Sequence, residues 1–232
     1  MGEMVSYSGN GGPSEGYLAL PNGSAADGPA RPAVIVIQEY WGLVEHITAL
    51  ADRFAAAGFV ALAPDLYHGV QASEPDEAAK LLMGLAMDRA AKDIAGAAAY
   101  LVERPDTADT VAAVGFCLGG SLALWSGTLS EHIVAGVGFY PAVPWERMGP
   151  EWGSYKGKTA MIHCSEGDGT SAAPGIQQAK AGIEAAGGDC VLYDYPGTQH
   201  AFFNDDRPEV YHGPAAASAW ARTLELLRSR LS

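Results

Sequence analysis

The feature that most constrains the fold is a series of short apolar runs that alternate with segments of helical periodicity. Residues 33–37 form such a run, built mainly from β-branched side chains, and this pattern is typical of a strand buried on both faces. Residues 43–57 follow with apolar side chains at helical spacing and end before Gly58. The alternation predicts an α/β fold with a mainly parallel central sheet flanked by helices on both faces. Further strands are predicted at residues 59–63, 110–114, 134–140, 159–164 and 190–195, and further helices at 77–87, 89–103, 121–126, 173–186 and 215–231.

The first 20 residues have a different pattern from the rest of the chain. Residues 5–8 and 17–20 favour two short strands, and the turn-rich residues 9–14 between them predict a short antiparallel N-terminal edge. A hydrophobic fraction of 48% supports a large core, and a charged fraction of 18% argues against disorder. Because the sequence contains no internal repeat and no long linker, we expect residues 1–232 to form a single domain.

Charge and cysteine content exclude several classes of function. The net charge of −13 argues against binding to nucleic acid or to an anionic membrane surface. The sequence has neither the roughly 18 continuous apolar residues of a membrane span nor a secretory signal. Its three cysteines lack the spacing of a disulfide framework or a zinc ribbon. We therefore expect a cytoplasmic protein that needs no metal or other cofactor.

One strand–turn–helix segment carries a candidate nucleophile, Cys117. Here the strand at residues 110–114 runs into a tight turn, and the helix at residues 121–126 follows. The turn is the G-x-S-x-G elbow of α/β-hydrolases with sulfur in place of oxygen, and its backbone leaves the N–H of Leu118 free to face an oxyanion. A helix N-terminus next to a cysteine also favours the thiolate. The alternative is a glycine-rich turn around a buried, inert cysteine. The turn reads Gly115-Phe116-Cys117-Leu118-Gly119-Gly120.

A thiol nucleophile needs a base within hydrogen-bond reach and an acid that orients the base. His200 follows the last predicted strand, whereas His163 lies inside an apolar strand, where a hydrogen-bonded core histidine is expected. Asp168 follows the preceding strand between two glycines, and Glu166 is a competing acid two residues earlier. The order Cys117, Asp168, His200 is the order of an α/β-hydrolase triad. Taken singly, a loop histidine and a turn-forming aspartate are ordinary features.

Several stretches spread over nearly the whole chain together match one enzyme family. They are Val36-Ile37-Gln38-Glu39-Tyr40-Trp41-Gly42, Ala63-Pro64-Asp65-Leu66-Tyr67, Gly115-Phe116-Cys117-Leu118-Gly119-Gly120, Gly167-Asp168 and His200-Ala201-Phe202. On these residues the chain resembles the dienelactone hydrolase (carboxymethylenebutenolidase) family of the α/β-hydrolase superfamily. The resemblance implies the α/β-hydrolase fold and a triad of Cys117, His200 and Asp168.

The resemblance also implies roles for two residues after the strand at 33–37. Glu39 matches a family glutamate that lies beside the cysteine and takes up its proton when substrate binds. A carboxylate near a thiol disfavours the thiolate until the partner of the carboxylate changes, so this role is physically sound. The alternative is a turn carboxylate bonded to backbone N–H groups. The N–H of Tyr40 is the implied second oxyanion donor, beside that of Leu118.

The sequence departs from the family where substrate charge is recognised. Typical members hold a substrate carboxylate with two arginines, one of which lies four residues after the catalytic histidine. Here that position is Asn204, and Lys80 is the only cation between residues 69 and 88. Arg207 follows Asp205 and Asp206, so we expect it to pair with them. A lysine does not replace a bidentate arginine, which argues against an anionic dienelactone as substrate.

Aromatic residues near the strand ends predict a pocket for neutral acyl or aryl groups, with core packing as the alternative. We therefore expect a cysteine hydrolase of small carboxylic esters or lactones with broad tolerance for neutral esters. Neutral phosphotriesters are an extension, because an oxyanion hole also polarises P=O. The rivals are a non-catalytic ligand-binding protein and a redox sensor at Cys117. We expect a monomer or weak homodimer, with residues 141–158 as an irregular lid. The aromatic residues are Trp41, Tyr140, Trp145 and Phe202.

Overall fold

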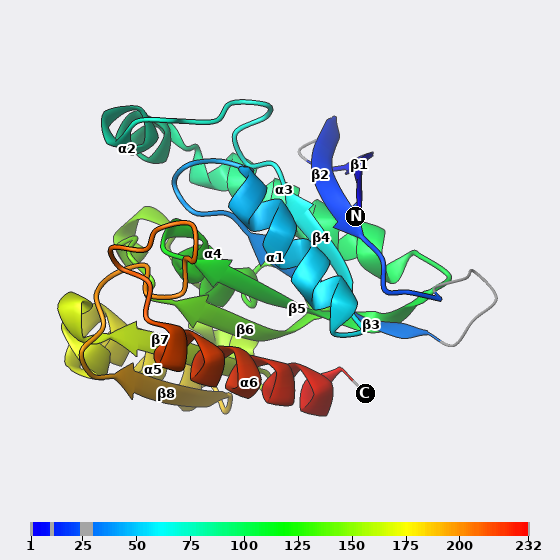
Figure 1. Ribbon diagram of the computed structural model, residues 1–232. Coiled ribbons are helices and arrows are strands. Elements are labelled where there is room, and N and C mark those ends of the chain that lie inside the picture. The colour runs from blue at the N-terminus through cyan, green and yellow to red at the C-terminus, as the bar shows by residue number, and fades with distance from the viewer. Residues whose placement is uncertain (1, 10–11, 24–29, 232) are drawn as a thin grey trace.

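The computed structural model describes residues 2–9, 12–23 and 30–231, so the predicted turn at residues 9–14 lies partly outside the described residues. Within the described part, eight strands form one sheet in the order β1-β2-β4-β3-β5-β6-β7-β8 (Figure 1). The strands are β1 (Glu3–Ser8), β2 (Pro13–Ala19), β3 (Arg31–Ile37), β4 (Val60–Pro64), β5 (Thr107–Phe116), β6 (Ile133–Phe139), β7 (Thr159–Ser165) and β8 (Asp189–Tyr195). The helices are α1 (Glu45–Ala56), α2 (Pro75–Gly84), α3 (Met87–Val102), α4 (Leu118–Ser126), α5 (Pro174–Ala185) and α6 (Gly213–Arg230).

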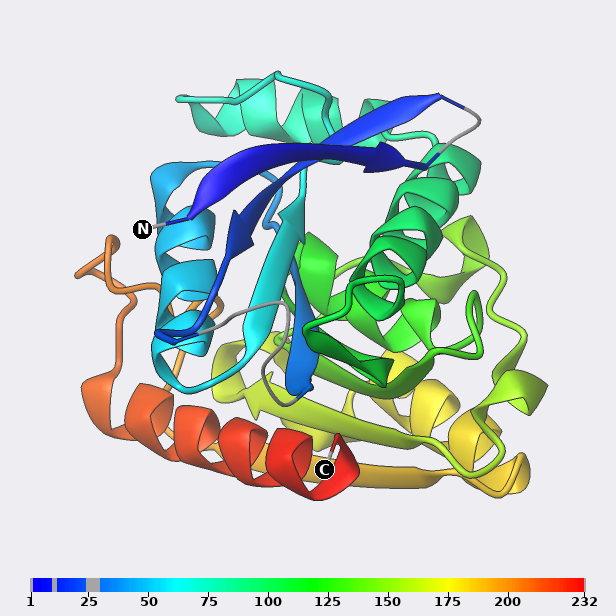
Figure 2. The same cartoon turned by 90° about the vertical axis from the view of Figure 1, so that its right-hand side faces the viewer.

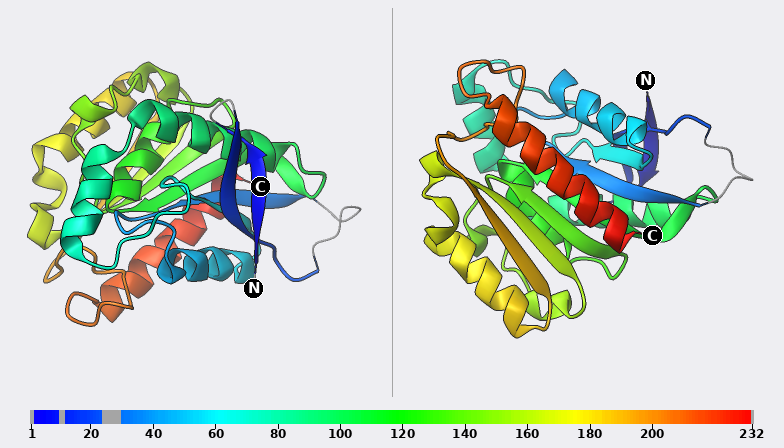
Figure 3. Two further views of the ribbon diagram at one scale, coloured as in Figure 1. Left: turned by 90° about the horizontal axis from the view of Figure 1, so that it is seen from above. Right: turned by 60° about the horizontal axis from the view of Figure 1, so that its bottom comes forward.

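The sheet is parallel from β4 to β8, and β1 and β2 add an antiparallel edge. Helices α1 and α6 cover one face, which Figure 3 shows from below, and α3, α4 and α5 cover the other, as the turned view of Figure 2 shows. The prediction of a mainly parallel sheet between two helical layers, with an antiparallel N-terminal edge, is therefore confirmed.

Each face of the sheet has its own hydrophobic core because side chains alternate along a strand. In β3, Ile35 and Ile37 pack under α3 and α4, while Val34 and Val36 pack under α1 and α6; all four are fully buried. Fully burying a side chain of this kind contributes roughly 1.5–3 kcal/mol. The continuous apolar run at residues 33–37 thus reflects burial on both faces.

The irregular residues 141–158 cover part of the carboxyl edge of the sheet. They contain two 3₁₀ turns, Trp145–Arg147 and Trp152–Tyr155. The guanidinium of Arg147 donates hydrogen bonds of 3.2 Å to 3.4 Å to the carbonyls of Leu82, Met83 and Leu85. These carbonyls lie at the end of α2, where the helix leaves acceptors unpaired, so Arg147 ties the segment to α2.

None of the helices in the described part of the chain is long and apolar enough to span a membrane.

Candidate active site

The turn after β5 holds Cys117 in a strained conformation that only closely packed glycines permit. Cys117 has φ of 55° and ψ of −114° and caps the N-terminus of α4. A Cβ on Gly115 would lie 2.0 Å from the carbonyl oxygen of Gly119, and a Cβ on Gly119 would lie 2.3 Å from that of Ile37. Backbone atoms cannot yield to such contacts, so larger residues are excluded. The turn projects the Cys117 side chain, 9% exposed, at the carboxyl end of β5.

His200 and Asp168 meet at the same edge of the sheet although different loops carry them. His200 follows β8, and Asp168 ends a 3₁₀ turn after β7. The Nδ1 of His200 is 2.8 Å from Oδ2 of Asp168. The hydroxyl of Ser165 donates to the same carboxylate oxygen and accepts from the N–H of Asp168. This second contact fixes the carboxylate that orients the imidazole.

The pKa values of this pair reflect its mutual contacts. Burial alone would lower the pKa of His200, but the hydrogen bond with Asp168 and the interaction with Cys117 outweigh it and raise the pKa to about 10. Burial alone would raise the pKa of Asp168, but the hydrogen bonds from His200 and Ser165 lower it. Asp168 therefore stays ionised at neutral pH and favours a protonated imidazole beside the sulfur.

Two other candidate residues, Glu166 and His163, have hydrogen-bond partners away from Cys117. Glu166 accepts a hydrogen bond of 2.7 Å from the N–H of Gly197 and so supports the loop that follows β8. The ring nitrogens of His163 are 2.9 Å from the hydroxyl of Tyr195 and 3.0 Å from that of Thr223. The expectation of a hydrogen-bonded core histidine is confirmed by these contacts and by full burial, and burial lowers the pKa of His163 to about 3.

Glu39 has a partner that no local sequence pattern indicates. Its Oε2 accepts a hydrogen bond of 2.9 Å from Nδ2 of Asn204, 165 residues later in the chain. Its Oε1 is buried and has no hydrogen-bond partner among the described residues. Burial raises the pKa of Glu39, and the bond from Asn204 offsets part of this effect. Asn204, which stands four residues after His200 where an arginine was expected from the resemblance, thus holds Glu39 by a hydrogen bond.

Two backbone N–H groups and three strained residues complete the surroundings of Cys117. Among the described residues, no carbonyl or side chain accepts a hydrogen bond from the N–H of Tyr40 or of Leu118. Positive φ angles occur at Cys117, at Tyr140 (38°) and at Ala201 (65°). Strain of this kind gathers where a structure holds reactive groups in place.

A cavity of about 260 Å³ opens in front of the sulfur. Arg207 lines this cavity, and its Nε donates a hydrogen bond of 2.9 Å to Oε1 of Glu209. The expectation that Arg207 pairs with Asp205 and Asp206 is therefore wrong, because these two carboxylates face His46 and Glu209 contacts Arg207 instead. The lining residues are Glu39, Tyr40, Trp41, Leu82, Cys117, His200, Ala201 and Arg207.

The four aromatic residues proposed for the pocket are not all brought together. Trp41 lines the cavity, and the ring of Tyr140 packs edge-on against His200 with centroids 5.0 Å apart. Trp145 lines a separate cavity of about 390 Å³ and donates to the carbonyl of Gly175. Phe202 is fully buried against Tyr140 and belongs to the core. Lys80 lines a third cavity, beside Tyr67.

The sheet order, the strained turn after β5 and the polar residues at the carboxyl ends of β3, β7 and β8 define an α/β-hydrolase. Comparison with protein families agrees, because a model described as the dienelactone hydrolase family matches residues 15–231. The chain belongs to the dienelactone hydrolase family and is an ester or lactone hydrolase.

Individual relatives resemble the chain over nearly its whole length. "Protein usf" of Aquifex pyrophilus is 33% identical over 240 residues, which cover 100% of both chains. A dienelactone hydrolase-like promiscuous phosphotriesterase from metagenomic libraries superposes with a TM-score of 0.84 at 22% identity, covering 100% of this chain and 99% of the other. A thermophilic esterase of Thermogutta terrifontis gives 0.68 at 19% identity, covering 97% and 91%. The two solved structures show a shared fold.

Proposed function

We propose that the protein is a cysteine hydrolase that cleaves carboxylic esters or lactones through a thioester at Cys117. The observation that carries the proposal is the contact of Asp168 with His200, at a cavity that His200, Cys117 and Glu39 line together. Each member has the environment that its role requires. Cys117 has its sulfur at a helix N-terminus, the imidazole of His200 has a raised pKa, and Asp168 is an ionised carboxylate that accepts two hydrogen bonds.

The proposed reaction has two steps. The Cys117 thiolate attacks the carbonyl carbon, and the resulting oxyanion accepts hydrogen bonds from the N–H groups of Tyr40 and Leu118. The C–O bond then breaks, the alkoxide takes the proton of His200, and a thioester remains. Water attacks this thioester while neutral His200 accepts its proton, and the acid product leaves with regeneration of the thiolate.

Glu39 is proposed to take up the proton of Cys117 when substrate binds. Its Oε1 is buried without a partner and its pKa is raised by burial, so a proton on this carboxyl stabilises it. The hydrogen bond from Asn204 to the other oxygen keeps the side chain at the cavity. Transfer of the proton from sulfur to Glu39 generates the thiolate when substrate fills the cavity.

For the substrate class we propose neutral esters of modest size. The cavity of about 260 Å³ has apolar walls at Trp41, Leu82 and Ala201, and the guanidinium in its lining, that of Arg207, already pairs with Glu209. A paired guanidinium holds a substrate carboxylate less strongly than a free one. Neutral phosphotriesters form a second proposed class, because the same N–H groups can polarise P=O and a similar fold carries a promiscuous phosphotriesterase.

Steady-state kinetics on matched substrates test the substrate class. We expect a higher kcat/KM for 4-nitrophenyl butyrate than for its carboxylate-bearing analogue, 4-nitrophenyl hemisuccinate, or for a muconate-type lactone. Glu209→Gln frees Arg207 and should raise kcat/KM for the hemisuccinate selectively, and Arg207→Gln should abolish that gain. A strong preference of the unaltered enzyme for the lactone would refute the neutral pocket.

Two rival functions are less well supported. A non-catalytic binding protein has no need of an ordered acid, base and nucleophile around one cavity. A redox sensor at Cys117 needs a resolving thiol, but burial raises the pKa of Cys164 to about 12 and of Cys190 to about 11. These thiols are poor nucleophiles at neutral pH.

We propose that the enzyme works in the cytoplasm as a monomer or weak homodimer. All three cysteines are buried free thiols, a state that reducing compartments maintain. The exposed large hydrophobic side chains of the described residues come from separate elements, and such scattered residues are normal for a monomer. They are Met4, Leu20, Val70, Met83, Val191 and Tyr211.

A further inference from the structure

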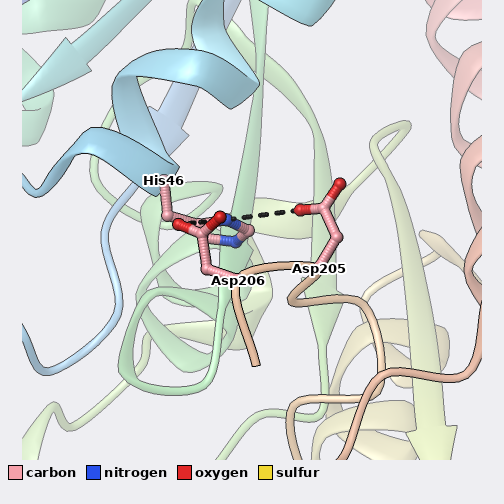
Figure 4. A group of neighbouring side chains, drawn as sticks. All are labelled: His46, Asp205 and Asp206. Carbon is pink, nitrogen blue, oxygen red and sulfur yellow. Dashed lines mark ion pairs between the residues drawn. The ribbon is translucent and has the colours of Figure 1, made fainter. Parts of the chain in front are cut away.

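A second cluster of polar side chains lies beside the active site, on the outer side of the loop that follows β8. His46 lies in the first turn of α1, and Asp205 and Asp206 lie in the loop. The Nδ1 of His46 is 3.6 Å from Oδ1 of Asp205 and 3.8 Å from Oδ2 of Asp206. Figure 4 shows the imidazole between the two carboxylates.

The histidine of this cluster is buried without a hydrogen bond to hold it. Its side chain is 5% exposed, and its Nε2 has no partner among the described residues. Its Nδ1 faces the two carboxylates at separations longer than a hydrogen bond of about 2.9 Å. Buried imidazoles normally have partners, and neither ring nitrogen of His46 makes a hydrogen bond among the described residues, although Nδ1 points at the two carboxylates.

The separations fit a shared metal ion. Metal–nitrogen and metal–oxygen bonds of about 2.1 Å place neighbouring tetrahedral ligands about 3.4 Å apart. The two measured separations are only a few tenths of an ångström longer, and one ligand atom from each of the three residues lies within 4.8 Å of the others. The side chains of Asp205 and Asp206 are exposed, so they can rotate to bring their oxygens closer to one ion.

The charge around the cluster also favours a cation. The residues bound a cavity of about 310 Å³ that Glu45 and Arg53 also line. Three carboxylates and one guanidinium line it, so acidic side chains outnumber the basic one. Arg53 approaches the other oxygen of Asp205, at 3.7 Å, and leaves Oδ1 free.

We propose that His46, Asp205 and Asp206 bind one divalent transition-metal ion, with water completing its coordination. One imidazole and two carboxylates suit Mn²⁺, Co²⁺ or Zn²⁺ better than Mg²⁺ or Ca²⁺, which prefer oxygen ligands alone. The ion joins α1 to the loop after β8.

The bound ion acts on the active site through the loop. The N–H of Asp206 donates a hydrogen bond of 3.1 Å to Oδ1 of Asn204, which in turn holds Glu39. Arg207, next in the chain, lines the catalytic cavity. Metal binding therefore orders the residues that position Glu39 without contact to substrate, and it should stabilise the protein.

Titration of Mn²⁺ and Co²⁺ into full-length Cys117→Ser protein tests the site, since this background removes the catalytic thiol as a metal ligand. We expect one equivalent to bind and to raise the melting temperature. Asp206→Asn should weaken binding at least about tenfold. The matched control is Asp76→Asn, an exposed aspartate in the first turn of α2, which should leave the affinity unchanged.

Paramagnetic broadening locates the ion without altering a ligand. Substoichiometric Mn²⁺ should broaden the imidazole signals of His46, which follows the carboxyl end of β3, and spare those of His132, which precedes the amino end of β6. The proposal is overturned if no saturable binding occurs at about 1 mM free cation, if Asp206→Asn binds as tightly as its parent, or if His132 broadens as strongly as His46.

Discussion

Replacing Asp168 with asparagine tests the proposed acid with little change of shape. Its Oδ2 accepts from both His200 and Ser165. If the amide oxygen of the asparagine takes that place, the geometry is kept and only the negative charge is lost. If the NH₂ group takes it, this donor faces the Nδ1–H of His200, and the imidazole is no longer held in the tautomer that catalysis requires. We expect kcat/KM for 4-nitrophenyl butyrate to fall about 10²–10⁴-fold, which corresponds to roughly 2.7–5.4 kcal/mol of transition-state stabilisation.

The matched control for this change is Glu166→Gln. Glu166 lies in the same 3₁₀ turn, but its carboxylate accepts from the N–H of Gly197 and does not contact His200. We expect its kcat/KM to stay within about threefold of wild type. Melting temperatures of both variants, measured beside the kinetics, separate lost chemistry from lost folding. A loss below tenfold for Asp168→Asn, or an equal loss for Glu166→Gln, would refute the assignment of the acid.

Three further predictions concern stability. Gly119→Ala should cost at least about 3 kcal/mol of unfolding free energy in urea titrations, because the added Cβ meets the carbonyl of Ile37. The control Gly153→Ala, with open space around it, should cost under about 1 kcal/mol. Equal costs would contradict the packing argument. Asn204→Ala should cost about 1–3 kcal/mol by leaving Glu39 without its donor, and a double-mutant cycle with Glu39→Gln should show coupling rather than additivity. Between pH 6.5 and 3 His163 is protonated in the unfolded state but not in the folded state. The unfolding free energy therefore falls as pH falls, by up to about 1.4 kcal/mol per pH unit from this residue. His163→Gln should show a shallower slope of unfolding free energy against pH, and an unchanged slope would exclude the buried neutral ring.

The fold was predictable because the sheet is buried on both faces. Full burial makes β3 and its parallel neighbours continuous apolar runs, and the covering helices keep one apolar stripe each. Element ends were less predictable. Helix α4 begins at Leu118 rather than at residue 121. Its first turn contains Gly119 and Gly120, which are poor helix formers and therefore hid the start of the helix in the sequence. The packed structure requires glycine at both positions, because a Cβ there would meet the carbonyls of Ile37 and Phe139.

The candidate triad could be placed from sequence because each member follows a strand whose end is recognisable. The support of Glu39 could not, because Asn204 is 165 residues away and their contact depends on where the loop after β8 returns to β3. The partner of Arg207 was misjudged for a related reason. Adjacent aspartates suggest pairing in sequence, but Asp205 and Asp206 turn toward His46, and the backbone brings Glu209 to Arg207.

The aromatic residues show the same limit. Trp41, Tyr140, Trp145 and Phe202 all follow strands or lie in the segment over the carboxyl edge, but only the packed structure assigns them to different places. Local sequence indicates that a large side chain lies near an edge, whereas its direction depends on backbone angles such as the positive φ of Tyr140.

The central claim is a thioester at Cys117, and trapping it is the most direct test. The enzyme is mixed with excess 4-nitrophenyl butyrate, quenched in acid during turnover, and analysed by intact and peptide mass spectrometry. We predict a mass gain of one butyryl group on the peptide that contains Cys117, and loss of both the adduct and at least about 10³-fold of kcat/KM in Cys117→Ala. An acyl group on another residue, or full turnover by Cys117→Ala, would contradict the mechanism.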